Sequence, residues 1–503
     1  MDKKLNVLLI TSDQQHWNTL GFLNSEIHTP NLDQLAAQGM VFSRTYCPNP
    51  TCTPTRASMI TGQYPSQHGA WSLGTKLMDD VHTVGEDFAA AGYRTALVGK
   101  AHFQPLASTE EFPSMEAYPI LQDLEFWKEF NGPFYGFEHV ELARNHTDEA
   151  HVGQHYALWM EEKGFASWRD SFRTPTGTQD AQEYSWDLPE EFHYNTWISD
   201  RTTGLLEDYQ QNDENFFLWA SFFDPHPSYL VPEPWASMYD PAALTLPGQR
   251  DEEHRDNPLH YRKTQEKNPD FSMYEEPGGN VCHGFESHLR TEEQLRKDLA
   301  CYYGMVSCLD KYIGRILDRL DELGLAENTL VIFTTDHGHL FGQHGLVAKG
   351  AFNYEDLIRI PFIARLPESI AAASQSPAMQ SLVDLAPTIL DFCGLPIPRT
   401  MTGISQKPVW LGEAGGVRDR IMVENRHQPF LVNSKTYVDR RYKLTVYCGS
   451  DEGELFDLQE DPGEFYNRWK DPGCRELRSE LMLKLIQAEM QKEPMPMPRI
   501  SMA

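Results

Sequence analysis

A cysteine, a proline and an arginine stand at every second position of the segment Cys52-Thr53-Pro54-Thr55-Arg56. Proline suits the first turn of a helix, because it lacks an N–H group that would have no partner there. The spacing therefore predicts a helix that begins at Cys52 and places the Arg56 guanidinium within one turn of the thiol. The positive end of a helix and a nearby cation favour anionic chemistry. Spacing alone leaves two interpretations of Cys52 open: a small buried residue at a helix start, and a thiolate nucleophile.

Further polar side chains each follow a segment with the composition of a buried strand. The predicted strands are 6–10, 94–99, 215–223 and 329–335. Because the carboxyl ends of parallel strands meet at one edge of a sheet, we expect the polar groups to converge there. In chain order these groups are Asp13-Gln14, Lys100 with His102, His226, and Asp336-His337.

Two of these groups have the chemistry of a metal site. Asp13, Gln14, Asp336 and His337 offer two carboxylates, an amide oxygen and an imidazole. Such a set suits one divalent cation. The imidazole favours Mn²⁺ or a similar transition metal more than an all-oxygen site would, and Ca²⁺ stays as an alternative.

The remaining groups supply positive charge. A single lysine is usually a solvated surface residue, but several cations at one sheet edge would suit a bound sulfate or phosphate. The candidate cations are Arg56, Lys100, His102, His226 and Lys349.

The order of the predicted elements indicates an α/β fold with a large, mostly parallel or mixed central sheet flanked by helices. Predicted helices at 32–38 and 295–323 alternate with the strands. Two stretches, at about 105–187 and 232–292, are rich in aromatic, acidic, Pro and His residues and have little periodicity. We interpret them as functional insertions over the active site.

A Gly-rich linker at 412–418 suggests a division into two parts. Residues 1–412 are predicted to form the catalytic domain. Residues 413–503 are predicted to form a smaller subdomain with a hairpin strand at 437–447, a terminal helix at 475–491 and an extended tail. The tail suggests contact with a neighbouring subunit, and hence a homo-oligomer.

Composition and charge make several classes of partner and location unfavourable. The chain of 503 residues has 43 basic and 73 acidic residues, a net charge of −30, which makes nucleic acid and anionic membranes unfavourable partners. No apolar run reaches the length of a membrane span, and the first apolar run is too short for a signal peptide. The eight cysteines are scattered, which fits a reducing compartment. We therefore predict a cytoplasmic protein.

Six motifs occur together in one order, and they cover nearly the whole chain outside the two insertions. They are C-x-P-x-R with T-G at 52–62, G-K-x-H at 99–102, D-P-H-P at 224–227, D-H-G followed by H-G-L-x-x-K at 336–349, V-D-L-A-P-T at 383–388, and E-L-F-D-L with D-P at 454–462. In this combination the chain resembles the sulfatase family of the alkaline phosphatase superfamily. The resemblance implies an alkaline-phosphatase-like fold with a smaller C-terminal α+β subdomain.

The resemblance also implies a third reading of Cys52, as the precursor of formylglycine made by a maturation enzyme. The hydrated aldehyde would attack the sulfur of a small sulfate ester, held by Arg56 and one divalent metal ion. Lys100 and Lys349 would neutralise the sulfuryl oxygens, His226 would protonate the leaving oxygen, and His102 would help release sulfate. The implied metal ligands are Asp13, Gln14, Cys52, Asp336 and His337, although most sulfatases have other residues at the positions of Gln14 and His337.

Alternatives remain. A phosphonate monoester or phosphodiester hydrolase of the same superfamily would share the nucleophile, but Lys100 and His102 are more typical of sulfatases. A non-catalytic binding protein would keep an unmodified Cys52. The substrate is open among aryl, carbohydrate and choline-like sulfates. Five tryptophans are more simply explained by packing than as a substrate platform: Trp127, Trp159, Trp168, Trp186 and Trp235.

Overall fold

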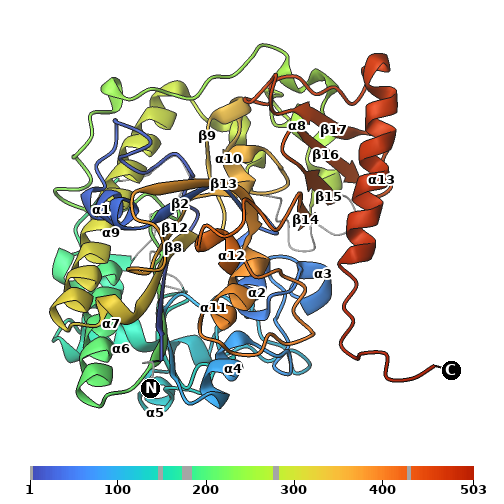
Figure 1. The fold of residues 1–503 in the computed structure, drawn as a ribbon. Coiled ribbons are helices and arrows are strands. Elements are labelled where there is room, and N and C mark those ends of the chain that lie inside the picture. Colours follow the sequence, from blue (N-terminus) through green and yellow to red (C-terminus); the bar gives the residue numbers. More distant parts are fainter. Residues whose placement is uncertain (1–3, 145–150, 173–183, 276–282, 428–431, 503) are drawn as a thin grey trace.

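The structure is a computed structural model that describes residues 4–144, 151–172, 184–275, 283–427 and 432–502. A large mixed sheet runs through the body between two layers of helices, and a smaller sheet with helix α13 lies at one side (Figure 1). This arrangement confirms the predicted α/β class.

Within the described ranges, the central sheet has nine strands in the order β11-β2-β12-β8-β1-β6-β3-β4, with β13 beside β2. Strand β1 pairs in parallel with β6 and β8, and β3 pairs in parallel with β6 and β4. The parallel half therefore brings the carboxyl ends of its strands to one edge, as expected. Its strands are β1 (Asn6–Ser12), β3 (Arg94–Gly99), β4 (His139–Leu142), β6 (Phe216–Ser221) and β8 (Thr329–Thr335).

The other half of the sheet is mixed. Strand β12 runs antiparallel to both β8 and β2, and β13 runs parallel to β2. The bounds are β2 (Met40–Tyr46), β11 (Arg359–Ile360), β12 (Phe362–Arg365) and β13 (Ser374–Ser381).

Alternate residues of β1 face two separate cores. Leu8 and Ile10 pack with the helices of one face, and Val7 and Leu9 pack with those of the other. This explains the continuous apolar run, because a strand covered on both faces has no solvent side. On the first face lie α1 (Pro30–Gln38), α6 (Gln154–Glu162), α7 (Tyr194–Gln211) and α9 (Glu292–Glu322); on the second lie α2 (Cys52–Thr61), α4 (Val84–Ala90), α11 (Leu385–Phe392) and α12 (Lys407–Trp410).

The stretch 105–187 differs from the expectation that it lies wholly over the active site. It supplies β4, the edge strand of the central sheet, and helices α5 (Leu124–Glu129) and α6. The strand is only four residues long, too short for a periodic pattern. Four of the five tryptophans, Trp127, Trp159, Trp168 and Trp186, are buried in the two cores, so packing accounts for them.

The stretch from 232 to 292 consists, where it is described, mainly of short turns of helix. Its one α-helix is α8 (Leu259–Lys263), and η8 (Phe285–Leu289) leads into α9. The other short elements of the body are α3 (Pro65–His68), β5 (Ser185–Trp186), β7 (Val231–Pro232), β9 (Leu340–Phe341), β10 (Val347–Ala348) and α10 (Glu355–Ile358).

The smaller sheet is an antiparallel meander, β14-β15-β16-β17. The predicted single strand at 437–447 is two strands that meet at a turn after Val438. Helix α13 spans Arg475–Gln491, as predicted, and packs on this sheet through Leu481 and Leu485. The strands are β14 (Ile421–His427), β15 (Val432–Val438), β16 (Tyr442–Tyr447) and β17 (Gly453–Asp457).

One buried carboxylate ties these parts together. Glu424 on β14 accepts hydrogen bonds from the Ser66 backbone N at 2.7 Å and from Lys435 at 2.6 Å, and it pairs with Lys492 after α13. Burial alone would raise the pKa of Glu424, but the two ammonium groups lower it from its usual 4.5 to about 2.

Replacing Glu424 by glutamine is expected to remove this pH-dependent stability. A lowered folded-state pKa stabilises the protein above pH 4.5, and the contribution is lost as the pH falls from 4.5 towards 2. The carboxylate then contributes about 3 kcal/mol at pH 7. Melting temperatures should differ most at pH 7 and converge towards pH 2, whereas Glu476→Gln, an exposed change on α13, should match the parent throughout. A difference in melting temperature that is the same at every pH would contradict this role of the Glu424 carboxylate.

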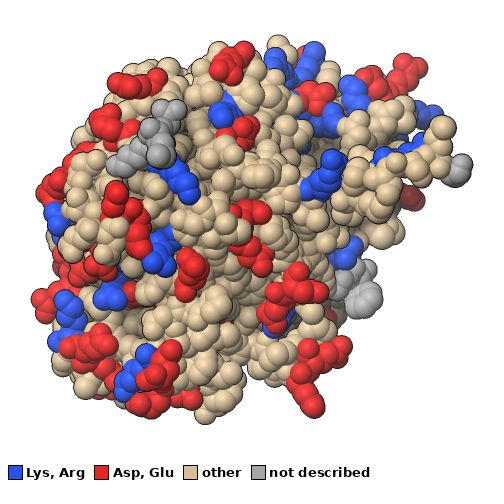
Figure 2. Space-filling model, turned by 60° about the horizontal axis from the view of Figure 1, so that its bottom comes forward, with Lys and Arg blue, Asp and Glu red and all other residues tan. Residues whose placement is uncertain are grey.

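Among the described residues, no helix is both long and apolar enough to cross a bilayer. Acidic side chains are spread over the face drawn in Figure 2, with Lys and Arg groups between them. The acidic groups on this face do not form one continuous patch.

Candidate active site

Helix α2 begins at Cys52, as predicted, and every residue in it is buried. The helix ends at Gly62, whose φ of 61° is in the left-handed region and closes the last turn. The thiol therefore lies at the N-terminal end of a helix inside the protein, next to the carboxyl ends of β1 and β8.

The Cys52 Sγ atom is surrounded by the groups that follow the strand ends. It lies 3.2 Å from His337 Nε2 and 3.1 Å from Lys349 Nζ. Asp13 Oδ1 is at 3.8 Å and Lys100 Nζ at 3.9 Å. The convergence expected from topology is present, although Lys349 is 297 residues from Cys52 in the chain.

Arg56 is a fully buried guanidinium with a partner on each nitrogen. Its Nε lies 2.9 Å from Asp336 Oδ2, and Nη2 lies 3.4 Å from Asp13 Oδ2. Its Nη1 donates to the Lys100 carbonyl at 2.9 Å and to Ser221 Oγ at 2.8 Å. One side chain therefore joins the ends of β1, β3, β6 and β8 and orients both carboxylates.

The predicted metal ligands fit a divalent cation. Ligand atoms of Asp13, Cys52, Asp336 and His337 all lie within 4.8 Å of one another. The His337 Nδ1 atom contacts the Gly338 carbonyl at 3.0 Å, so Nε2 is the nitrogen that faces the site.

Gln14 completes the donor set. Its Oε1 is buried and has no hydrogen-bond partner among the described residues. Its Nε2 is 2.7 Å from His339 Nδ1, and His339 Nε2 is 2.7 Å from the Tyr229 hydroxyl. These contacts fix the orientation of the Gln14 side-chain amide and leave its Oε1 available as a metal ligand. A buried acceptor without a partner is costly unless a cation or water fills the role.

Lys349 lies between the nucleophile position and His226. Its Nζ is 3.1 Å from His226 Nε2 as well as 3.1 Å from the thiol. Lys349 follows the β9–β10 hairpin, and the left-handed φ of 61° at Ala348 turns the chain there. His226 is half-buried and follows β6, where it lines the mouth of the site.

Lys100 and His102 follow β3. Lys100 is buried and its ammonium forms an ion pair with Asp13 Oδ2. His102 is buried, and its Nδ1 has no hydrogen-bond partner in the described part of the chain. Burial and nearby cations, Arg144 first among them, hold the pKa of His102 well below its usual value. The imidazole is therefore neutral and can accept a proton.

The electrostatics of the site favour anions. Burial and Asp13 would raise the pKa of the Cys52 thiol, but the Lys100 and Lys349 ammonium groups outweigh them and lower it. Burial would also raise the pKa of Asp13, yet that pKa lies well below its usual range because of four nearby cations: Lys100, His226, Arg56 and Lys349.

A cleft of about 210 Å³ leads from these residues towards the surface. Gln14, His226 and Lys349 form its inner end. Sequence reasoning missed four residues of this region, Tyr229, Arg290, Ser221 and His339. Only His339 carried a signal, as the second histidine of Asp336-His337-Gly338-His339.

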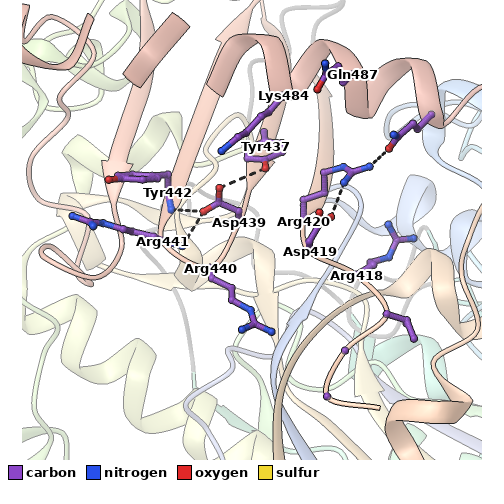
Figure 3. A pocket seen from close by; sticks show the side chains of 14 residues that line it. Arg418, Asp419, Arg420, Tyr437, Asp439, Arg440, Arg441, Tyr442, Lys484 and Gln487 are labelled. Atoms are coloured by element: carbon purple, nitrogen blue, oxygen red, sulfur yellow. Dashed lines mark hydrogen bonds and ion pairs between the residues drawn. The ribbon is translucent and has the colours of Figure 1, made fainter. Parts of the chain in front are cut away.

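Two other features are not part of this site. A hollow of about 1140 Å³ in the C-terminal part is lined from α13 and the loops beside β14 to β16 (Figure 3). Its arginines are largely paired with carboxylates, such as Arg441 with Asp457 at 2.8 Å. A second buried group of His193, Asp224 and Cys308 has its carboxylate held by Tyr194 and Asn195. We interpret that group as support for the turn before His226.

Comparison with known proteins agrees with the geometry. The sulfatase family profile matches residues 5–395, and the profile described as N-sulphoglucosamine sulphohydrolase, C-terminal, matches residues 342–491. An arylsulfatase of Clostridium perfringens is 28% identical over 92% of this chain and 90% of its own length. The multifunctional alkaline phosphatase superfamily protein PehA of Trinickia caryophylli is 28% identical over 93% of this chain and 91% of its own.

Among solved structures, the phosphonate monoester hydrolase SpPMH from Silicibacter pomeroyi superposes with a TM-score of 0.80 at 25% identity. The superposition covers 98% of this chain and 96% of that chain. The fold, the strand-end residues around Cys52 and a family profile over most of the sequence agree. The chain therefore belongs to the sulfatase family, the sulfuric ester hydrolases of the alkaline phosphatase superfamily.

Proposed function

We propose that the protein hydrolyses small sulfate esters through a formylglycine formed from Cys52, and releases inorganic sulfate and an alcohol or phenol. The observation that carries the proposal is the position of the Lys349 ammonium, 3.1 Å from both the Cys52 thiol and His226. With Lys100 and Arg56 nearby, this buried site is locally positive in a protein of net charge −30. Such a site suits a reacting group that carries negative charge on its oxygens.

The side chains around residue 52 have separate tasks. Asp13, Gln14, Asp336 and His337 would hold one divalent cation together with residue 52. When bound, Ca²⁺ or Mn²⁺ would supply positive charge to the nucleophilic oxygen and the sulfuryl group. Arg56 orients the two carboxylates. One hydroxyl of the hydrated aldehyde loses its proton to water and, as the alkoxide, attacks sulfur in line with the leaving alcohol, while Lys100 and Lys349 offset the charge on the sulfuryl oxygens.

Two imidazoles move the protons. His226, beside Lys349, gives a proton to the leaving oxygen as the S–O bond breaks. The neutral His102 then accepts the proton of the second hydroxyl. The C–O bond to sulfate breaks, sulfate leaves, and the aldehyde forms again. A serine or cysteine has no second hydroxyl and would need water to attack sulfur instead.

Replacing His226 by alanine is expected to harm substrates with poor leaving groups most. Loss of a general acid costs about 10²–10⁴-fold for an alkyl sulfate, but a nitrophenolate leaves without a proton. Rates for a series of substituted phenyl sulfates should show a steeper dependence on leaving-group pKa than those of the parent. The exposed His82→Ala serves as the matched control. Equal losses across the series would refute the acid assignment.

A second candidate is phosphonate monoester or phosphodiester hydrolysis at the same site. The structural likeness to SpPMH favours it, and the name of PehA describes that relative as multifunctional. The pair Lys100 and His102 supports sulfate as the preferred group, because this pair is more typical of sulfatases than of the phosphonate monoester hydrolases. Comparing kcat/KM for 4-nitrophenyl sulfate and 4-nitrophenyl phenylphosphonate decides between them; a preference for the phosphonate would reverse the ranking.

The remaining parts of the proposal concern maturation, location in the cell, domain division and assembly. Cys52 requires a maturation enzyme, and the protein acts in the cytoplasm. We propose the division into residues 1–412 and 413–503, and a homo-oligomer formed through α13 and the tail. Met482, Ile486 and Met490 form an exposed apolar stripe on α13, and the tail with exposed Met497 and Met502 runs away from the body (Figure 1). The mass in solution tests this assembly.

A further inference from the structure

Away from its inner end, the catalytic cleft adjoins a second hollow. That hollow has a volume of about 540 Å³ and shares four residues with the 210 Å³ cleft. The shared residues are Arg290, Leu295, Phe341 and Val347. A substrate whose sulfate lies at Cys52 can therefore extend its alcohol past this shared wall. Arg290 is the only charged residue in the wall, so it is placed to sense the alcohol's chemistry.

Among the described residues, the Arg290 guanidinium has fewer hydrogen-bond and ion-pair partners than a nearly buried arginine normally has. The side chain is only 11% exposed, and its one ion pair in the described part of the chain is with Asp298 at 4.0 Å. Asp298 is itself engaged by the Tyr184 hydroxyl at 2.9 Å. A guanidinium carries five N–H donors, and a nearly buried one normally has them satisfied. Arg290 therefore has donors available to a ligand in the cleft.

Arg290 is next to the start of a long, well-packed helix. It lies between η8 and the N-cap residue Thr291 of α9, a helix of 31 residues that packs in the main core. Leu295 in the same wall belongs to the first turns of α9. Binding groups on a rigid element lose little entropy when they order a ligand.

Beyond Arg290 the second hollow is rich in amide and hydroxyl groups. Gln249, Thr264 and Gln265 line it, and its charged residues are of both signs, with Glu266 and Glu292 beside Lys267 and Arg290. Such a lining matches a neutral, oxygen-rich group better than an aryl ring or a quaternary ammonium.

We propose that Arg290 is a specificity-determining residue that binds an oxygen acceptor, a hydroxyl or carboxylate, on the leaving alcohol. The preferred substrate is then the sulfate ester of a polyoxygenated alcohol that reaches from the cleft into the second hollow. This proposal rests on the proposed sulfate ester hydrolysis. It disfavours a choline-like alcohol, whose cation would face the guanidinium, and it gives a bare aryl sulfate no contact with Arg290.

The test compares the Arg290→Met variant with the parent, both with residue 52 converted to formylglycine. The substrates are phenyl sulfate, choline sulfate and a set of hexose 6-sulfates. For the hexose sulfates kcat/KM should fall about 10- to 100-fold, the effect of a lost charge-assisted hydrogen bond, and the loss should lie in KM. Phenyl sulfate should change less than about threefold. Arg290→Lys should restore part of the loss. Arg255→Met, an exposed arginine that pairs with Glu252, is the matched control.

Three results would overturn the proposal: equal losses on all substrates, no loss on any, or choline sulfate as the best substrate of the parent. Failure of the proposed function is recognised separately. If the parent cleaves no sulfate ester but cleaves phosphonates, the same comparison with phenyl and hexosyl phosphonate monoesters decides the role of Arg290. If it cleaves neither class, both proposals fail.

Discussion

Cys52→Ala is expected to reduce turnover to the background rate while leaving the fold intact. Every transfer step proposed here passes through residue 52, which lies beside both Lys349 and Lys100. Alanine removes the oxygen nucleophile, and removing a nucleophile costs on the order of 10⁶-fold in kcat. Sulfate release measured by ion chromatography, at substrate concentrations well above KM, gives the loss directly.

The matched control for this experiment is Cys47→Ala. Cys47 is also fully buried, but it packs in the second core, and the one hydrogen-bond contact of its Sγ within the described part of the chain is to the Leu357 carbonyl at 3.9 Å. That variant should keep full activity. Peptide mass analysis of the parent should show residue 52 lighter than cysteine, since formylglycine replaces sulfur and two hydrogens by one oxygen. Oxidation of a thiol would make it heavier. Substantial turnover by Cys52→Ala, or by a parent whose Cys52 is unmodified, would contradict the mechanism.

Asp13→Asn is expected to remove both the bound metal and nearly all activity. The carboxylate faces the Cys52 thiol at 3.8 Å and pairs with the Lys100 and Arg56 cations. Asparagine keeps the shape but not the charge, so the site loses an anionic ligand and gains uncompensated positive charge. We expect metal content to fall from about one ion per chain towards zero, and kcat/KM to fall about 10³-fold or more.

Asp79→Asn is the control for that change, because Asp79 is an exposed carboxylate paired with Lys76. It should retain metal and activity. Metal is measured by plasma mass spectrometry after dialysis, and circular dichroism checks the fold. An Asp13→Asn protein that still binds a full equivalent of metal would contradict the assignment of Asp13 as a metal ligand.

Much of the fold follows from local pattern. Strands β3 and β8 and helix α13 have the bounds expected from composition and periodicity. The two strands carry apolar runs, and the α13 segment has no Gly or Pro between Gly473 and Pro494, which are clear local signals. The four-residue β4 has no such signal, and its place in the sheet depends on pairing with β3. The turn between β15 and β16 was missed, because the alternation of residues continues across it.

The sequence by itself determined the kinds of chemistry present and the edge where they would meet. A carboxylate, imidazole or lysine directly after a buried strand must lie at the carboxyl edge of a parallel sheet, so Asp13, Lys100 and His226 could be placed without coordinates. Tertiary structure alone decided the contacts between residues held by loops. Examples are Lys349 between Cys52 and His226, His339 against Gln14, and Arg290 in the cleft wall. Such loops have no periodicity, and the packing of distant segments sets their positions.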